Sequence, residues 1–306
     1  MEIISNNVSK VYKIKKGLFR TYEVNVVSGL NYSIKQGEII GLLGAEASGK
    51  STFIKLLSGN VLPTAGEVFV DGEVDYKKLK NNCEIINDFS KCNLNEGETV
   101  YNNFVHFGAK NKLDELTVEK NISIYRDIFE LDDSINKNVS ELNNLELVKV
   151  NLTLAMLKGV STLFFDSSLS DLAPVEKNVV LKLLKRLNKE NKTTIVVGSS
   201  KVDDIEKICK RVTVINKGSI VRDGAFEELK TDLCSKKEIK ITFNKTYSLP
   251  KGDFEIIEHD DYFLKIKVDF AKCDFANLIT QFDVNTIVDI GISNTAIFWF
   301  WYQFNK

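Results

Sequence analysis

The sequence lacks the hydrophobic segments that mark membrane-spanning or secreted chains. No apolar run approaches the roughly 20 residues that a spanning helix needs, and the most apolar stretch, residues 296–302 (AIFWFWY), is much shorter. The residues after Met1 have neither the basic nor the apolar region of a signal peptide. We therefore expect any membrane contact to go through another protein. We expect residues 296–302 to form a buried strand or a patch that faces a partner.

The cysteines and the net charge argue against disulfides, a metal site and nucleic-acid binding, and the two histidines suggest no catalytic site. The cysteines are odd in number and have no CxxC spacing, which favours buried thiols in a reducing cytosol over disulfides or a metal site. There are five: Cys83, Cys92, Cys209, Cys234 and Cys273. For the two histidines, His106 and His259, we expect surface or packing roles. The formal net charge of −1 gives no electrostatic reason to expect nucleic acid as a partner.

The chain is long enough for one large domain and one small one, with 306 residues of which 43% are hydrophobic. Beyond Leu229 the pattern changes, and apolar and polar side chains alternate as they do in strands. The alternating runs are residues 239–243, 254–257 and 262–268. We expect a large domain over residues 1–230 and a small α+β appendage over residues 231–306.

The large domain has the pattern of a parallel sheet wrapped by helices. Residues 1–37 predict antiparallel strands joined by a basic loop from Lys13 to Arg20. Residues 99–157 are mostly helical in pattern, and residues 202–209 predict a further helix. Short, continuous apolar runs, typical of strands buried on both faces, occur at residues 38–43, 161–165 and 193–197. We therefore expect an α/β fold with a mostly parallel sheet, an antiparallel N-terminal β-subdomain and a helical subdomain.

A loop of small residues follows the first of these buried strands and precedes a helical run that ends at Gly59. Residues 44–52 read GAEASGKST, which fits the phosphate-loop pattern GxxxxGK[ST] in its usual strand-to-helix context. Small residues let backbone N–H groups surround phosphate oxygens, and the helix N-terminus adds positive partial charge. Lys50 is expected to reach the β- and γ-phosphates. The predicted nucleotide-binding residues here are Gly44, Ala47, Ser48, Gly49, Lys50, Ser51 and Thr52.

A carboxylate stands at the end of a second buried strand. Asp166 follows the apolar residues Leu163, Phe164 and Phe165. A carboxylate in that position can hold Mg²⁺ from the side opposite the Ser51 hydroxyl. An aspartate after a strand is weak support by itself, but it is good support beside a phosphate loop. The sequence thus predicts a site for ATP and Mg²⁺, with Ser51 and Asp166 as the metal ligands.

Six further segments in order resemble the ATP-binding subunits of ABC transporters. They are residues 8–12 (VSKVY), 63–68 with 71–72, 99–103, 139–142, 203–212 and 217–221. The resemblance implies a P-loop NTPase core, and it makes Tyr12 the residue that stacks on adenine. The appendage resembles the tail of ATP-binding subunits of bacterial ABC-2-type exporters, through its strand and helix pattern as far as Phe298.

The chain departs from this family where hydrolysis takes place. The resemblance places the glutamate that polarises the attacking water at Ser167, the switch histidine at Ser200 and the Gln-loop residue at Ser90. A serine does not accept the water's proton at neutral pH. Losing a positioned base typically costs about 10²–10⁴-fold in rate.

Other family positions are also substituted. The signature Ser-Gly-Gly-Gln is replaced by residues 143–146 (NNLE), where Leu145 would crowd the ATP of the opposing subunit and Glu146 would add negative charge near phosphate. The D-loop aspartate falls at Ala173. In the phosphate loop, Glu46 would repel phosphate if it faced inward and would be harmless if it faced solvent.

Together these matches and losses imply a subunit that binds Mg-ATP and hydrolyses it weakly or not at all. Family subunits dimerise head to tail, so the expected partners are a membrane subunit and a second ATP-binding subunit, identical or different. The expected place is the cytoplasmic face of the cell membrane, as a peripheral protein. Two functions stay open: the ATP-binding subunit of a bacterial exporter, or a catalytically inert module that regulates or scaffolds a transporter by pairing with an active ATPase.

Overall fold

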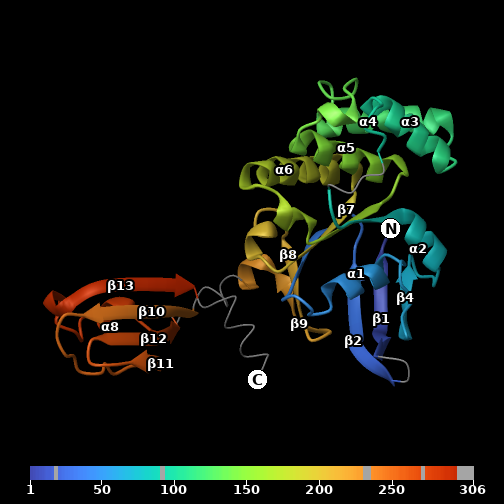
Figure 1. Ribbon diagram of the computed structural model, residues 1–306. Coiled ribbons are helices and arrows are strands. Elements are labelled where there is room, and N and C mark those ends of the chain that lie inside the picture. The colour runs from blue at the N-terminus through green and yellow to red at the C-terminus, as the bar shows by residue number, and fades with distance from the viewer. Residues whose placement is uncertain (17–19, 90–93, 230–235, 270–272, 295–306) are drawn as a thin grey trace. The chain divides into compact units, whose positions relative to one another are not determined.

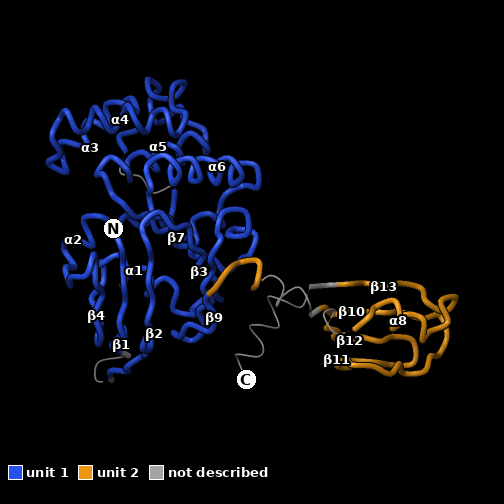
Figure 2. The backbone as a smooth tube through the Cα atoms, turned by 180° about the vertical axis from the view of Figure 1, so that it is seen from behind, with its two compact units in different colours: residues 1–223 blue, residues 224–306 orange. Residues whose placement is uncertain are grey.

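The structure, a computed structural model, describes residues 1–306 except for residues 17–19, 90–93, 230–235, 270–272 and 295–306. The chain divides into two compact units, residues 1–223 and 224–306 (Figure 2). The predicted patch at 296–302 and the Gln-loop position Ser90 lie outside the described residues.

The first unit is built on a six-stranded sheet of order β5-β6-β7-β3-β8-β9. Its strands are β3 (Ile39–Leu43), β5 (Cys83–Ile86), β6 (Thr162–Asp166), β7 (Thr194–Ser199), β8 (Arg211–Asn216) and β9 (Ser219–Ala225). Neighbours from β5 to β8 pair in parallel. The predicted α/β class with a mostly parallel sheet is confirmed. Because parallel strands end at one edge, the residues that follow β3, β6 and β7 come together there.

A three-stranded antiparallel sheet of order β2-β1-β4 lies in the same unit. Its strands are β1 (Ile3–Lys16), β2 (Arg20–Ile34) and β4 (Ala65–Val70). The expectation of a basic loop from Lys13 to Arg20 was wrong, because β1 continues to Lys16, which pairs with Arg20. Lysines alternate with Tyr12 and Ile14 in this stretch, and that alternation suits a strand whose charged face is in solvent.

Helices complete the first unit. They are α1 (Lys50–Leu57), α2 (Tyr76–Asn82), α3 (Val100–Lys110), α4 (Glu115–Phe129), α5 (Asn144–Leu157) and α6 (Pro174–Asn191). Helices α3, α4 and α5 pack on one another as the predicted helical subdomain (Figure 1). Short 3₁₀ turns occur at Val139–Glu141 and Ser168–Asp171.

The helix predicted over residues 202–209 was also wrong. Only a 3₁₀ turn forms there, at Val202–Asp204, and non-helical turns follow. The side chain of Asp204 is fully buried and bonds to groups on two other segments. This tertiary demand outweighs the local helical pattern.

The second unit is a four-stranded antiparallel sheet of order β11-β12-β10-β13. Its elements are β10 (Lys236–Phe243), β11 (Phe254–His259), β12 (Phe263–Asp269), α8 (Phe275–Ile279), a 3₁₀ turn (Val284–Thr286) and β13 (Ile287–Asn294). Its small core is formed by alternate residues of β10 and β12 together with Leu278 of α8 and Phe282.

Candidate nucleotide site

The phosphate-loop sequence forms a tight turn between β3 and α1. A Cβ on Gly44 would lie 2.5 Å from Ser48 Oγ and 2.6 Å from the Ile215 carbonyl oxygen, so no larger residue fits without movement. Gly49 caps α1 with a φ of 103°, and a Cβ there would lie 2.7 Å from the Val26 carbonyl oxygen. The backbone path therefore requires both glycines, and it sets the N-terminus of α1 at the end of β3.

Lys50 is buried within this turn. Its Nζ donates hydrogen bonds to the carbonyl oxygens of Gly44 at 2.6 Å and Ala45 at 2.8 Å. Burial lowers the pKa of Lys50, while the nearby carboxylates of Asp166 and Glu46 act to raise it. Neutral carbonyls hold an ammonium group less strongly than charged oxygens do, so phosphate oxygens would replace them readily.

Ser51 and Asp166 meet at the first turn of α1. The Ser51 hydroxyl donates a hydrogen bond of 2.9 Å to Asp166 Oδ1, the acceptor at the last residue of β6. Mg²⁺ prefers oxygen ligands and is usually held by one or two protein groups together with substrate phosphates. The pair therefore fits Mg²⁺ bound to a nucleotide. Within the described residues no group of three or more His, Cys, Asp and Glu side chains could hold a metal ion by itself.

The other predicted loop residues have distinct surroundings. Ala47 adopts a φ of 59°, a left-handed conformation that suits glycine better. Ser48 is buried, and its carbonyl oxygen accepts a hydrogen bond of 2.9 Å from the Gly218 N–H. Thr52 is half-buried in α1, and Glu46 is exposed. The Glu46 carboxylate is nonetheless close enough to act on the pKa of Lys50, so both alternatives for Glu46 stay open.

Tyr12 lies on β1, directly opposite Val24 of β2. Two residues along β2, Val26 places its carbonyl oxygen against Gly49 of the phosphate loop. The Tyr12 ring is half-buried, and Lys10 Nζ lies 5.3 Å from its centroid. The strand thus brings Tyr12 to the neighbourhood of the loop, where a base would extend from bound phosphates.

The positions expected to carry the hydrolytic groups lie at the same sheet edge. Ser167 follows Asp166 with a φ of 65°, and its N–H donates a hydrogen bond of 2.9 Å to the Gly198 carbonyl oxygen. Ser200 follows β7, which pairs with both β6 and β3. Two serines thus follow β6 and β7 at the positions where the resemblance predicts a carboxylate and an imidazole.

The segment at the expected signature position caps its own helix, α5. The Asn143 side chain accepts a hydrogen bond from the Glu146 N–H at 3.0 Å, and Glu146 accepts one from the Asn143 N–H at 2.9 Å. The Glu146 carboxylate also accepts from Ser134 at 2.9 Å and from Lys137 Nζ at 2.7 Å. Burial works to raise the pKa of Glu146, but these donors outweigh it and hold the pKa below its ordinary value. The negative charge expected near phosphate is therefore compensated inside the subunit.

Sequence reasoning missed a buried acid next to the candidate site. Asp204 is fully buried, and its carboxylate accepts hydrogen bonds from Lys177 of α6, Ser170 and Ser199. Burial works to raise the pKa of Asp204, but the three donors outweigh it and keep the pKa below the ordinary value. We call these four residues the Asp204 clasp. It joins the turn after Ser167 to the end of β7, and no local sequence pattern marks it.

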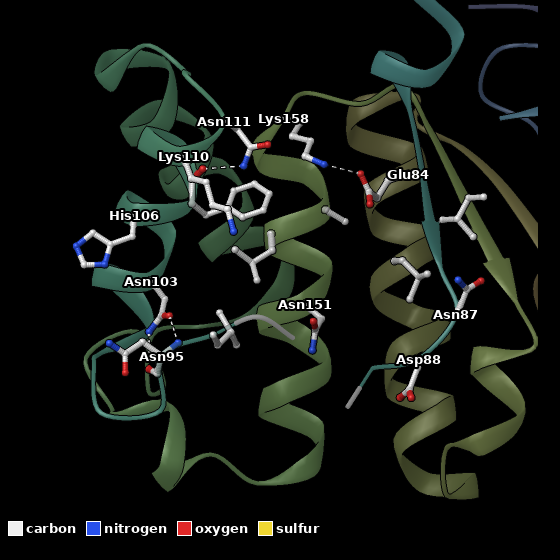
Figure 3. Close-up of a pocket in the computed structure, with 16 residues that line it drawn as sticks. Glu84, Asn87, Asp88, Asn95, Asn103, His106, Lys110, Asn111, Asn151 and Lys158 are labelled. Carbon is white, nitrogen blue, oxygen red and sulfur yellow. Dashed lines mark hydrogen bonds and ion pairs between the residues drawn. The ribbon is translucent and has the colours of Figure 1, made fainter. Parts of the chain in front are cut away.

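A cleft of about 660 Å³ lies beside the helical subdomain (Figure 3). Its walls come from β5 and the segment after it, from α3 and from α5. Glu84 and Lys158 form an ion pair of 2.9 Å on its wall, and amide side chains such as Asn103 and Asn151 line the rest. Apolar side chains, among them Phe107 and Leu154, share the lining with these polar groups.

Comparisons with known proteins agree with the geometry of the loop. The family model described as "ABC transporter" matches residues 27–170. Methionine import ATP-binding protein MetN 2 from Bacillus licheniformis is 31% identical over 261 residues, which cover 83% of this chain and 74% of that protein. This chain belongs to the ATP-binding proteins of the ABC transporter family. MetN 2 from Bacillus cereus is 27% identical over 226 residues, so the match spans only 65% of that relative's length.

Solved structures share the fold of this ABC protein. The structure of CbiO1 from Clostridium perfringens, described as part of the ABC transporter complex CbiONQ, has a TM-score of 0.65 at 22% identity and covers 74% of this chain and 89% of its own. The dimeric ATP-binding cassette MJ0796, bound to ADP and phosphate, has a TM-score of 0.58 at 22% identity, covering 73% of this chain and 98% of its own. No helix in the described part of this ABC protein is long and apolar enough to cross a membrane.

Proposed function

We propose that this ABC protein binds Mg-ATP and acts as the ATP-binding subunit of a transporter. The observation that carries the proposal is the buried Lys50 ammonium beside the Ser51–Asp166 pair at the N-terminus of α1. Lys50 and the loop N–H groups would bind the β- and γ-phosphates, and Tyr12 would stack on adenine. Ser51 and Asp166 would hold Mg²⁺, which neutralises phosphate charge when bound.

Hydrolysis is proposed to be weak or absent. Ser167 and Ser200 occupy the sheet edge where a general base and a γ-phosphate contact are needed, and neither can take a proton at neutral pH. The loss of the base alone accounts for about 10²–10⁴-fold in rate. Bound ATP would then act mainly by stabilising the nucleotide-bound state. The alternative, an inert module that regulates or scaffolds a transporter beside an active ATPase, uses the same site.

A second ATP-binding subunit is part of the proposal. In a head-to-tail dimer, the N-terminus of α5 would face the partner's ATP. Its Glu146 N–H already bonds to the Asn143 side chain, and Leu145 adds bulk next to it. A second copy of this chain would therefore offer a poor surface for ATP, which favours a partner subunit with a different signature segment.

The membrane subunit is proposed to contact the cleft beside β5, α3 and α5, and this contact would hold the protein at the cytoplasmic face of the membrane. An ion pair and several amides in the cleft suit a polar partner segment. Nucleic acid is not proposed as a partner. Export stays a prediction from the pattern of the appendage. The relatives from Bacillus cereus and Bacillus licheniformis are named as import proteins, and those names favour import instead.

Binding of Mg-ATP by calorimetry tests the proposal. Lys50→Ala removes a group that would make two charge-assisted hydrogen bonds to phosphate, and we expect it to weaken binding at least about 100-fold. Asp166→Asn should remove most of the dependence on Mg²⁺ and leave some binding. Lys55→Ala is the matched control, because Lys55 is an exposed lysine on the same helix. Equal affinity in the wild type and Lys50→Ala would refute the proposed site.

A further inference from the structure

Within the described residues, β13 ends the sheet of the second unit with no further strand beside it. The sheet order makes β11 and β13 the two edges (Figure 1). Natural proteins usually protect such edges with bulges, lysine or proline. The register of β11 shifts between Ile256 and Glu258, whereas the residues from Asp289 to Asn294 pair with β10 without a shift. The sequence of β13, IVDIGISN, contains neither lysine nor proline.

Apolar side chains of β13 are exposed on the face that holds the core of the second unit. Ile290 and Ile292 lie opposite Ile241 and Ile239 of β10, which are fully buried. Directly opposite residues share a face, so the core face continues onto β13. Val288, Ile290 and Ile292 are nevertheless 63%, 36% and 48% exposed. Three such side chains along one edge are more than the single exposed residues that are normal on a surface.

The strand is complementary to a second copy of itself in one antiparallel register. A two-fold axis through Ile290, perpendicular to the sheet, places Ile290 opposite its own copy and Val288 opposite the second copy's Ile292. All three exposed apolar side chains are then paired. The same register places Asp289 opposite the second copy's Gly291. An axis through Asp289 would instead set two aspartates against each other, which is destabilising.

Gly291 leaves room for a charge pair across this register. It lies opposite Lys240 of β10, and a Cβ at Gly291 would lie 3.9 Å from the Lys240 Cβ. The exposed Lys240 side chain lies 5.1 Å from the centre of the Phe263 ring, a weak contact at an exposed site. Two strand spacings, about 9.6 Å, separate Lys240 from the second copy's Asp289. Their extended side chains span that distance, because Gly291 places no side chain between them.

We propose that β13 pairs with β13 of a second copy of this chain and joins the two four-stranded sheets into one continuous antiparallel sheet. Strand addition at an edge combines main-chain hydrogen bonds with side-chain contacts. One strand pair buries less than a standard interface, so we expect a dissociation constant on the order of 10 μM. This contact goes beyond the proposed ATP site. It lies in the second unit and leaves the choice of partner at the ATP site unaffected.

Sedimentation equilibrium of the purified full chain without nucleotide, from about 1 to 200 μM, tests the proposal. We expect a reversible equilibrium between monomer and dimer. Ile290→Lys sets two lysines against each other at the two-fold axis and should weaken dimerisation at least about 100-fold. Ile256→Lys is the matched control, because Ile256 is 39% exposed and lies on the same face at the other edge. It should dimerise as the wild type does.

A charge exchange on the opposite face of the sheet tests the register independently of Ile290. Asp289→Lys places like charges near the second copy's Lys240 and should weaken dimerisation roughly tenfold. Adding Lys240→Asp restores opposite charges, so the double variant should dimerise about as well as the wild type. Both residues are exposed, so these variants should keep the wild-type circular dichroism spectrum.

Hydrogen exchange locates the contact and separates it from ATP binding. The N–H groups of β13 that point away from β10 gain partners only in the dimer, so their exchange should slow as the protein concentration rises. Exchange in β11 should not change. Lys50→Ala should dimerise as the wild type does, because its substitution lies in the first unit. A failure of the proposed ATP site would therefore leave this result intact.

Three outcomes would overturn the proposal. The first is a wild-type chain that stays monomeric over the whole concentration range. The second is equal dimerisation of Ile290→Lys and Ile256→Lys, which would assign self-association to another surface. The third is slow exchange in β13 at every concentration, which would mean that the chain covers this edge with its own residues, such as the apolar residues 296–302.

Discussion

The Asp204 clasp predicts a large and specific cost for removing one lysine. In Lys177→Met the fully buried carboxylate of Asp204 keeps only the hydroxyls of Ser170 and Ser199. Breaking a buried ion pair by removing one partner typically costs about 3–5 kcal/mol, because the remaining charge is left uncompensated. The Lys177 side chain is 17% exposed, so solvent screens the pair only slightly.

A double-mutant cycle separates this cost from other effects of the substitution. Asp204→Asn removes the buried charge, so adding Lys177→Met to it should cost about 1–3 kcal/mol less than Lys177→Met alone. Lys185→Met is the control, since Lys185 is exposed on the same helix, and it should cost no more than about 0.5 kcal/mol. The assay is urea unfolding followed by far-ultraviolet circular dichroism, which reports mainly the helices of the first unit.

The pH dependence gives an independent check on the clasp. The pKa of Asp204 is held below its ordinary value of 3.8 in the folded state. The ionised Asp204 carboxylate therefore stabilises the folded state fully at pH values above 3.8. This stabilisation is lost as the pH falls from 3.8 toward the pKa of Asp204 in the folded state. Asp204→Asn should remove this part of the acid sensitivity. Additive costs in the cycle, or a cost for Lys177→Met no larger than for Lys185→Met, would refute the reasoning.

Three further predictions concern single residues. Ala47→Gly should raise the free energy of unfolding by about 1 kcal/mol in thermal denaturation, because Ala47 has a left-handed φ of 59°; a loss of stability would contradict this. Ser167→Glu should raise ATPase turnover by less than about tenfold, because Ser200 and the signature segment stay substituted; a gain of about 10²–10⁴-fold would show that the base alone was missing. The pKa of the Cys83 thiol is raised to about 12 by burial, so Cys83 should resist alkylation in the folded protein and react after unfolding, and rapid native modification would contradict its burial.

Local signals in the sequence were sufficient for three adjacent strands of the six-stranded central sheet. The runs at 38–43, 161–165 and 193–197 are continuous and apolar, and they correspond to β3, β6 and β7. The glycines of the phosphate loop could be read from their spacing in the motif, although the groups that exclude a Cβ at Gly44 and Gly49 include the distant carbonyl oxygens of Ile215 and Val26. Strand β5 was not predicted, because Cys83–Ile86 is short and starts directly after α2.

Features that depend on distant residues could not be read from the sequence. The clasp joins Ser170, Lys177, Ser199 and Asp204, which no single motif connects. The sequence led us to expect the Glu146 charge to lie near phosphate. In the structure Ser134 and Lys137 donate hydrogen bonds to its carboxylate, and the sequence around Glu146 does not reveal these partners. The Asn143-to-Glu146 spacing fits a capping box and was the one available signal.

The central claim is that this ABC protein binds ATP and does not turn it over efficiently. The direct test is to incubate the purified chain with radiolabelled Mg-ATP, isolate the protein and identify the bound nucleotide, with Lys50→Ala as the control. The account predicts intact ATP on the wild type and none on Lys50→Ala. Bound ADP that accumulates above the Lys50→Ala control would contradict it, because it would show that Ser167 and Ser200 do not disable the site.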